Sequence, residues 1–296
     1  MVMKPTSLPQ IIRRRVNIEF DPAKARGWYF TKKEIEDFLN AVSFIFPPGE
    51  KFFIQSVQNY RDRITDPLLK EQVKGFIYQE AMHTKEHVRC NLALAEAFPL
   101  GHKVEEFTAK FISLVHRFSP KATQLAWTCA LEHFTAILAD TLLSNQEAFI
   151  NDTDPAFAAL WLWHAVEESE HKAVCFDVYQ EVVGKGVLSY LHRVIVMFLT
   201  SLTFLITLYF AMRQVKKSAK DAGQNRPADQ PREPPASPDT PAKPGLRRLM
   251  KIVPVKLYLD YYRPSFHPWD HNNVPLIEEW KRRYRDFGGP DVAVSQ

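Results

Sequence analysis

Two copies of the pattern Glu-x-x-His, at Glu80–His83 and Glu168–His171, are the residues of this sequence best suited to chemistry. Each copy lies in a stretch that predicts a helix, and side chains three residues apart on a helix project from the same face. A carboxylate and an imidazole placed in this way can bind one metal ion together. A single copy is weak evidence, because glutamate and histidine are common on helix surfaces.

Two further glutamates, Glu50 and Glu132, complete a recognisable ligand set. A di-metal carboxylate bundle takes one Glu from each of two helices and Glu-x-x-His from each of the other two. The midpoint between Glu50 and the first motif falls at Thr65-Asp66-Pro67, and the midpoint between Glu132 and the second motif lies beside 151–155. Because both midpoints fall at turns, each glutamate is level with its motif in an antiparallel hairpin. The pattern predicts a ferritin-like four-helix bundle with a dinuclear metal site.

Some acidic residues near these positions are alternatives. Glu50 follows Pro47-Pro48-Gly49 and could instead complement a helix dipole, in which case Glu34 or Glu36 would be the alternative ligand. In the last ligand helix Glu167 and Glu170 compete with Glu168. Only Glu168 has a histidine three residues later, so the other two are expected to face solvent or to support a ligand.

Two histidines extend the ligand faces. His164 lies four residues before Glu168, and we expect it to be a third imidazole ligand. His87 lies four residues after His83 and is an extra ligand or a residue that supports one. Cys129 and Cys175 share these faces, but thiolates suit softer sites than a carboxylate-rich one, so they are expected to be small buried fillers.

Local patterns predict the helices that position these residues. Capping residues, prolines and apolar spacing place helices at 31–46, ended by Pro47-Pro48-Gly49, and then at 50–64, 67–98, 103–118, 121–150, 155–183 and 274–284.

The stretch Val194–Met212 contains nineteen residues without a formal charge. This approaches the ~20 residues that span a bilayer. The threonines at 200, 203 and 207 share one helical face, so the alternative is a helix packed within the protein. The stretch therefore predicts either membrane anchoring, with a membrane surface as partner, or burial, and it favours a hydrophobic small-molecule substrate.

Composition divides the chain into four regions. Residues 1–48 form an N-terminal lead and helix, and 49–219 form the di-metal bundle together with the hydrophobic helix 194–212. Residues 220–245 are rich in proline and predict a disordered linker. Residues 246–296 form an aromatic tail that is too short for its own core and is expected to dock on the bundle.

The overall composition is that of an ordinary globular protein. The 296 residues are 46% hydrophobic and 24% charged, and the scarcity of glycine, with only 10 residues, favours an all-α fold. The net charge of +4 gives no indication of nucleic-acid binding. Three widely spaced cysteines and the lack of a secretory signal predict a cytoplasmic location. The oligomeric state does not follow from the sequence.

Several segments resemble a bacterial ferritin-like family of predicted metal-dependent hydrolases. They are GEKFF at 49–53, FIYQEAMHTKEH at 76–87, LEHF at 131–134, WHAVEESEHK at 163–172 and YYRPSFHPWD at 261–270. The resemblance implies metal ligation by Glu50, Glu80, His83, Glu132, Glu168 and His171. The last ligand helix, with His164 four residues before Glu168, is also distantly similar to that of the non-haem di-iron arylamine N-oxygenases.

These features favour a metal-dependent enzyme. The first hypothesis is an O₂-activating oxygenase or oxidase with two metal ions, iron first and manganese or zinc as alternatives, acting on a hydrophobic small molecule with an electron donor where one is needed. The alternative is a hydrolase in which a metal-bound water attacks an ester or amide. A third hypothesis is a non-catalytic metal-binding or membrane-associated protein.

Overall fold

The computed structural model describes residues 8–223, 254–284 and 293–294, which are almost entirely helical, so the predicted all-α class is confirmed for them. Three 3-10 turns connect the longer elements, and two short strands pair antiparallel. The elements are β1 (Arg14–Arg15), η1 (Pro22–Lys24), α1 (Lys33–Gln58), η2 (Arg61–Arg63), α2 (Pro67–Leu94), α3 (Gly101–Phe118), α4 (Lys121–Leu143), α5 (Gln146–Asn151), α6 (Pro155–His171), α7 (Val174–Val182), α8 (Val187–Gly223), α10 (Val255–Asp260), η3 (Pro268–Asp270), α11 (Val274–Tyr284) and β2 (Ala293–Val294).

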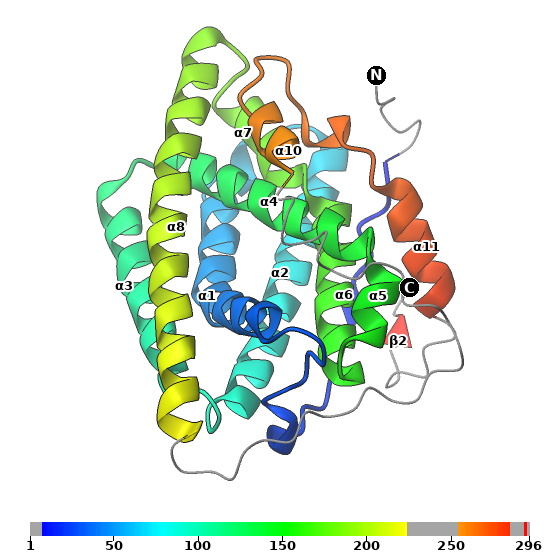
Figure 1. The fold of residues 1–296 in the computed structure, drawn as a ribbon. Coiled ribbons are helices and arrows are strands. Elements are labelled where there is room, and N and C mark those ends of the chain that lie inside the picture. The colour runs from blue at the N-terminus through cyan, green and yellow to red at the C-terminus, as the bar shows by residue number, and fades with distance from the viewer. Residues whose placement is uncertain (1–7, 224–253, 285–292, 295–296) are drawn as a thin grey trace.

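Four helices contact one another in a closed ring. α1 packs on α2, α2 on α6, α6 on α4, and α4 on α1 (Figure 1). α1 and α2 are joined through η2, and α4 and α6 are joined through α5. The two Glu-x-x-His motifs therefore lie on α2 and α6, while Glu50 and Glu132 lie on α1 and α4.

The two motif helices begin in the same way. The Asp66 side chain accepts hydrogen bonds from two backbone N–H groups at the start of α2, and Asp154 accepts one from Ala156 at the start of α6. Each aspartate is followed by a proline at the first helical position, where the missing N–H costs nothing. Both motif glutamates follow their proline by the same 13 residues (80 − 67 and 168 − 155). Equal spacing places the two motifs about 20 Å along their helices.

The prediction that Pro47-Pro48-Gly49 ends the first helix is wrong, because α1 continues through these residues to Gln58. Pro47 cannot donate to the carbonyl of Ser43, but the Asn91 side chain on α2 donates to that oxygen instead, at 3.1 Å. One of the two lost helical bonds is thereby replaced, and the prolines bend the helix without ending it (Figure 1). The expected division between residues 48 and 49 falls inside this helix.

Two other predicted helices are interrupted. The predicted helix 121–150 divides into α4 and α5, and the Asn145 side chain donates to the carbonyl of Thr141 that the helix end leaves free. The predicted helix 155–183 divides into α6 and α7 around Lys172 and Ala173. Contacts between Lys172 and the C-terminal tail hold the chain there, and no local pattern marks them.

The hydrophobic stretch 194–212 forms the middle of α8, which packs on α1, α3 and α4 (Figure 1). Its segment Val187–Lys220 is long and apolar enough to cross a membrane, and 28% of its most apolar window is buried inside the protein. A buried helix of the core would be covered on all sides. α8 instead covers one flank of the four-helix ring and exposes its other face.

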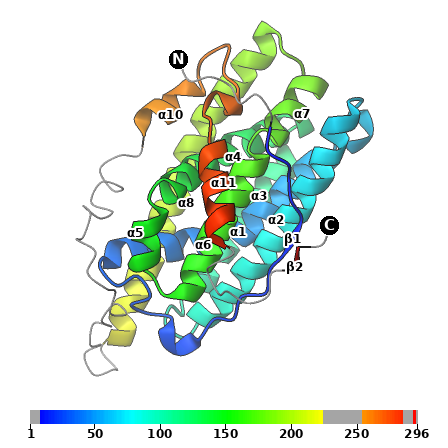
Figure 2. The same cartoon turned by 90° about the vertical axis from the view of Figure 1, so that its right-hand side faces the viewer.

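Both ends of the described chain pack against the ring. The N-terminal segment runs along α2 and α6, and β1 pairs with β2 (Figure 2). In the tail, α10 packs on α4, while α11 packs on both α4 and α6. Most of the predicted linker 220–245 lies outside the described residues.

Candidate metal centre

The predicted ligands meet inside the ring of α1, α2, α4 and α6. Within the described residues their donor atoms form four overlapping buried groups, and the atoms of each group lie within 4.8 Å of one another. Two of the groups are Glu50, Glu80 and His83, and Glu80, Glu132, Glu168 and His171. The other two contain His164, one with His83 and Glu168 and one with Glu50 and His87. Glu80 and Glu168 therefore face both positions.

Distances across the centre show how the motif residues face each other. His171 Nε2 lies 3.1 Å from Glu80 Oε1 and 3.5 Å from both Glu132 Oε2 and Glu168 Oε2. On the opposite side, His83 Nδ1 lies 3.5 Å from Glu168 Oε1. Each imidazole thus directs one nitrogen toward the shared carboxylates.

The other ring nitrogen of each motif histidine makes a hydrogen bond to a residue outside the predicted ligand set. His83 Nε2 lies 3.1 Å from Glu167 Oε2, and His171 Nδ1 lies 2.8 Å from Gln79 Oε1. A hydrogen bond to one ring nitrogen fixes the tautomer and orientation that metal-ligating histidines need. The two rings use different nitrogens, so the two positions are not equivalent.

Unpartnered oxygens mark the middle of the centre. Within the described part of the chain, none of the six carboxylate oxygens of Glu50, Glu80 and Glu132 accepts a hydrogen bond of normal geometry. Leaving buried polar atoms without partners costs about 1–3 kcal/mol each. Glutamates in this state are expected where a ligand, here a cation, completes them. The donor set of carboxylates and imidazoles therefore fits divalent metal ions.

Charge leads to the same conclusion. Burial, together with the nearby Glu80, raises the pKa of Glu50 well above its usual value. Burial and the nearby Glu168 do the same for Glu132. Ionised carboxylates in a buried site require compensating positive charge. Two divalent cations would balance the four carboxylates of the ligand set.

The two additional histidines lie one after the other, with His164 next to Glu168 and His87 next to His164. His164 Nε2 lies 2.9 Å from Glu168 Oε1, and its ring stacks on His83 with centroids 4.0 Å apart. His87 Nε2 lies 2.8 Å from His164 Nδ1, and His87 Nδ1 bonds to the Ser43 hydroxyl. Burial lowers the pKa of both histidines, that of His164 to about 4. His164 thus faces the carboxylates directly, whereas both nitrogens of His87 are already bonded.

Arg14 completes the support behind the motif histidines. Its guanidinium donates to Glu167 at 3.1 Å and to both oxygens of Glu170, at 2.6 and 2.9 Å. Glu170 also accepts from the Gln79 amide, which holds His171. Of the two alternatives for Glu167 and Glu170, facing solvent is wrong, because both are buried against this arginine, and supporting a ligand agrees with their contacts to His83 and Gln79.

Sequence reasoning did not identify Arg14 or Gln79. Arg14 lies in the run Arg13-Arg14-Arg15, which reads as a solvated basic lead, and more than 150 residues separate it from its partners. Gln79 directly precedes Glu80 and points to the neighbouring helix. Neither has a local signal, although a polar residue beside a ligand motif is a reasonable place to search.

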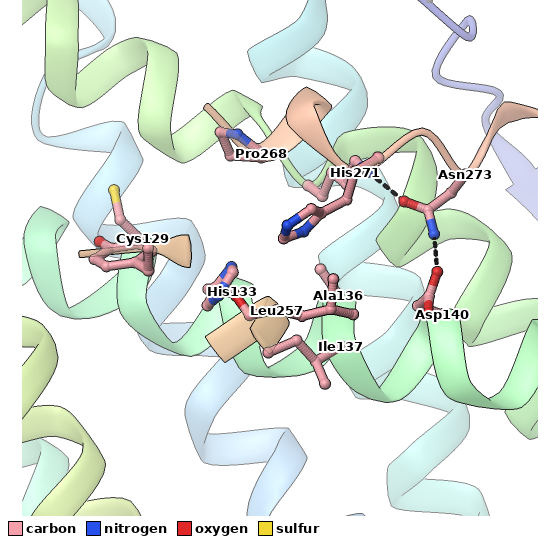
Figure 3. Close-up of a pocket in the computed structure, with 11 residues that line it drawn as sticks. Cys129, His133, Ala136, Ile137, Asp140, Leu257, Pro268, His271 and Asn273 are labelled. Carbon is pink, nitrogen blue, oxygen red and sulfur yellow. Dashed lines mark hydrogen bonds between the residues drawn. The ribbon is translucent and has the colours of Figure 1, made fainter. Parts of the chain in front are cut away.

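A second polar cluster joins α6 to the tail directly after His171. Lys172 Nζ donates to the His271 carbonyl and to the Asn273 side chain, whose amide donates to Asp140 on α4 (Figure 3). Burial lowers the pKa of Lys172 to about 7. His133 lies nearby and bonds to the Leu257 carbonyl at 3.0 Å. The cluster fixes the tail against the end of the ligand helix.

His267, in the C-terminal tail, bonds to Asp177 and caps η3. Cys129 and Cys175 are buried, as expected, and the three cysteines are free.

Comparison with known proteins identifies the family. A family profile described as predicted metal-dependent hydrolase matches residues 12–272, which include every candidate ligand. Curated proteins and solved structures gave no match. Since the profile covers most of its length, the chain belongs to the family of predicted metal-dependent hydrolases.

Proposed function

We propose that this protein is a hydrolase that holds two divalent metal ions inside a ferritin-like four-helix bundle. Glu50 and His83 would bind the first ion, Glu132 and His171 the second, and Glu80 and Glu168 would contact both. One observation carries the proposal: two buried donor groups, each with one motif histidine, share Glu80, and Glu168 of the second group also lies beside His83, while within the described residues six carboxylate oxygens lack a hydrogen-bond partner of normal geometry. The order Glu, Glu-x-x-His, Glu, Glu-x-x-His on α1, α2, α4 and α6 supports the ferritin-like arrangement.

Bound divalent ions supply Lewis acidity and lower the pKa of water to near neutrality. In ester hydrolysis the water oxygen forms a bond to the carbonyl carbon, the bond to the alcohol oxygen breaks, and the alcohol leaves with a proton. The protein contributes the positions of the groups. Glu167 and Gln79 hold the two motif imidazoles in fixed orientations, and the Thr135 hydroxyl donates to Glu168 Oε2. Family membership supports hydrolysis as the leading reaction.

Oxidation by O₂ at two iron ions, or at one manganese and one iron, is the second candidate. A specific observation favours it: His164 directs Nε2 at Glu168, which would add a third imidazole to a carboxylate-rich set. Such hard ligands suit ferrous ions with open positions. This reaction would also need an external electron donor.

Metal analysis of the purified full-length protein tests the proposal. We expect about two ions per chain, lost or strongly reduced in Glu80→Ala and His171→Ala and unchanged in Glu34→Gln, a control on an exposed residue. Hydrolysis of a nitrophenyl ester that depends on zinc or manganese would support the leading reaction. Oxygen consumption with iron, without ester hydrolysis, would favour the second. A protein without bound metal would contradict both.

We also infer that α8 lies on a membrane surface and does not cross the bilayer. One face packs on α1, α3 and α4, while the other exposes ten large apolar side chains with helical spacing. They are Val187, Leu188, Leu191, Ile195, Phe198, Leu199, Leu202, Leu205, Ile206 and Tyr209. Exposed basic residues follow at Arg213, Lys216 and Lys217. An apolar face followed by lysine and arginine binds anionic lipid surfaces.

Co-sedimentation with vesicles that contain phosphatidylserine tests this inference. Phe198→Glu, placed in the middle of the exposed face, is expected to abolish binding. Leu114→Glu, an exposed leucine on α3, is the matched control and should bind as the unmodified protein does. Equal binding by both variants would contradict docking through α8. The cytoplasmic location remains a prediction from the sequence.

A further inference from the structure

A cavity of about 580 Å³ lies between α1, α3, α4 and α8, beside the candidate metal centre. The side chains that line it are aliphatic and aromatic, with hydroxyls of threonine, serine and one tyrosine as their main polar groups. Among the described residues, none with a charged side chain lines it. Its volume is within the ~300–1,000 Å³ of small-molecule sites, and its lining suits an uncharged, apolar ligand.

The cavity is long. Its lining residues on α1 extend from Ile35 to Phe53, 18 steps along the helix. At ~1.5 Å per residue this is about 27 Å measured along the helix. Because α1 bends at Pro47 and Pro48, the lining wall bends with it. A flexible chain fits such a space better than a rigid ring system does.

Part of the cavity wall adjoins the metal centre. Gly49, Leu131 and Thr135 line it. Gly49 directly precedes Glu50, Leu131 precedes Glu132, and the Thr135 hydroxyl donates to Glu168. A Cβ atom at Gly49 would have no heavy atom within 4 Å, so the space beside Glu50 is open. The Phe46 ring, with its centroid 4.8 Å from both His87 and His164, forms the wall between the cavity and these two histidines.

The cavity also reaches the exposed face of α8. Leu205 lines it and is 61% exposed. Leu205 belongs to the exposed apolar face of α8 defined above, and its neighbours Thr203, Phe204 and Leu208 line the cavity as well. The same helix therefore has a surface suited to lipid and a wall of the cavity. A hydrocarbon chain could pass from one to the other without crossing a charged layer.

We propose that this cavity binds the hydrocarbon chain of a long-chain acyl ester or amide taken from a lipid surface, with the carbonyl group placed at the metal centre. The proposal rests on the proposed function for the reaction at the carbonyl. Chain binding itself requires only the cavity. The two can therefore be tested separately.

Binding of cis-parinaric acid, a fatty acid whose fluorescence rises in apolar surroundings, provides the direct test on the full-length protein. We expect saturable binding both with metal and after chelation. Competition by octanoate, laurate and palmitate should strengthen with chain length, by about fourfold per methylene group while the chain still fits. No saturable binding, or equal competition by the three acids, would overturn the proposal.

Two variants locate the chain. Thr207 lines the cavity from α8, so Thr207→Trp should fill part of it and weaken binding by about tenfold or more, a loss of a few methylene contacts. Leu202→Trp, on the exposed face of the same helix and outside the lining, is the matched control and should bind normally. Gly49→Leu should weaken palmitate more than octanoate, since it shortens the space beside Glu50. Normal binding by both cavity variants would contradict the assignment.

Metal content measured on the same samples separates the two proposals. Chain binding without bound metal would support the cavity and reject the hydrolase. Two bound metal ions with no chain binding would support the hydrolase and reject the binding of a hydrocarbon chain in the cavity.

Discussion

Two buried glutamates on α1 show what distinguishes a structural carboxylate from a candidate ligand. Glu36, on the arm before the bend, is 4% exposed, and Glu50, on the arm after it, is 1% exposed. Glu36 accepts hydrogen bonds from the backbone N–H groups of Tyr29 and Gly27. Neither oxygen of Glu50 has a partner of normal geometry in the described chain. The two carboxylates are therefore almost equally buried, and they differ in their hydrogen bonding.

This difference explains how a helix can contain two buried acids with unlike roles. The carboxylate of Glu36 is satisfied by the chain that leads into the helix, so nothing further is needed there. Glu50 faces Glu80 and His83 and is complete only with a cation between them. Each prediction below changes one of these environments and asks whether the other responds.

The largest expected effect is the stabilisation that metal supplies through Glu50. At a thousandfold excess over the dissociation constant, each bound ion should raise the free energy of unfolding by about 4 kcal/mol. Glu36→Gln should keep the full gain, whereas Glu50→Gln should lose the part due to the first ion. Chemical unfolding with and without chelator measures both. Identical metal-dependent gains in the two variants would remove the distinction between the arms.

The next effect is a pH dependence that belongs to Glu36. Burial raises its pKa to about 7, so the folded state keeps a proton that the unfolded state releases near pH 4.5. The contribution to stability is complete below pH 4.5 and is lost as the pH rises to about 7, by about 3 kcal/mol. Relative to the unmodified protein, Glu36→Gln should therefore gain about that amount between pH 4.5 and pH 8. Unfolding of the metal-saturated proteins across this range tests it, and a constant difference between the two would contradict it.

A smaller effect, on metal affinity, is expected at Glu167, a buried glutamate beside a motif histidine. Glu167 bonds to Arg14 and His83, and it affects the metal site through its contact with His83. Glu167→Gln should lower metal affinity by about 10–100-fold, the usual result of changing such a support. Competition with a metal-binding dye measures the affinity, with Glu36→Gln as the control that should not change it. An unchanged affinity in Glu167→Gln would show that His83 needs no such support.

The smallest effect concerns Gly49, next to Glu50. Gly49→Ala should stabilise the protein by up to about 1 kcal/mol, because alanine favours a helix and the new methyl group enters open space. Metal content should not change. Gly101→Ala is the contrasting variant, since its methyl group would lie 2.3 Å from the Phe44 ring and should destabilise the protein. Thermal unfolding distinguishes the two signs, and destabilisation by Gly49→Ala would indicate that the space beside Glu50 is filled.

The sequence allowed the helical class and the meeting of the ligand candidates to be predicted for a physical reason. Helix periodicity and Asp-Pro starts are local signals, and hairpins convert equal spacing from a turn into spatial proximity. The same local signals failed at Pro47 and Pro48. There the compensating hydrogen bond comes from Asn91 on another helix, and only the tertiary structure shows it.

The support behind the ligands and the cavity depends on contacts between distant segments. In the sequence Arg14 is one of three consecutive arginines. Only the path of the N-terminal segment along α2 and α6 shows that it is the buried one. Trp127 lines the cavity, whereas Phe76, Trp161 and Phe176 do not. Which face of an aromatic side chain meets empty space depends on the packing of four helices, so no pattern within one helix could reveal it.

The long separation between Arg14 and α6 also bears on when the centre can be completed during synthesis. Glu170 lies 156 residues after Arg14 in the chain and therefore leaves the ribosome later. At about 5–20 residues per second, the arginine waits on the order of ten seconds for its partner. During this interval α1 and α2 can already form their hairpin by local contacts, whereas the second half of the ligand set does not yet exist. The first Glu-x-x-His motif is therefore exposed to cellular metal ions before the second, and correct loading requires that early binding remain reversible until α6 arrives.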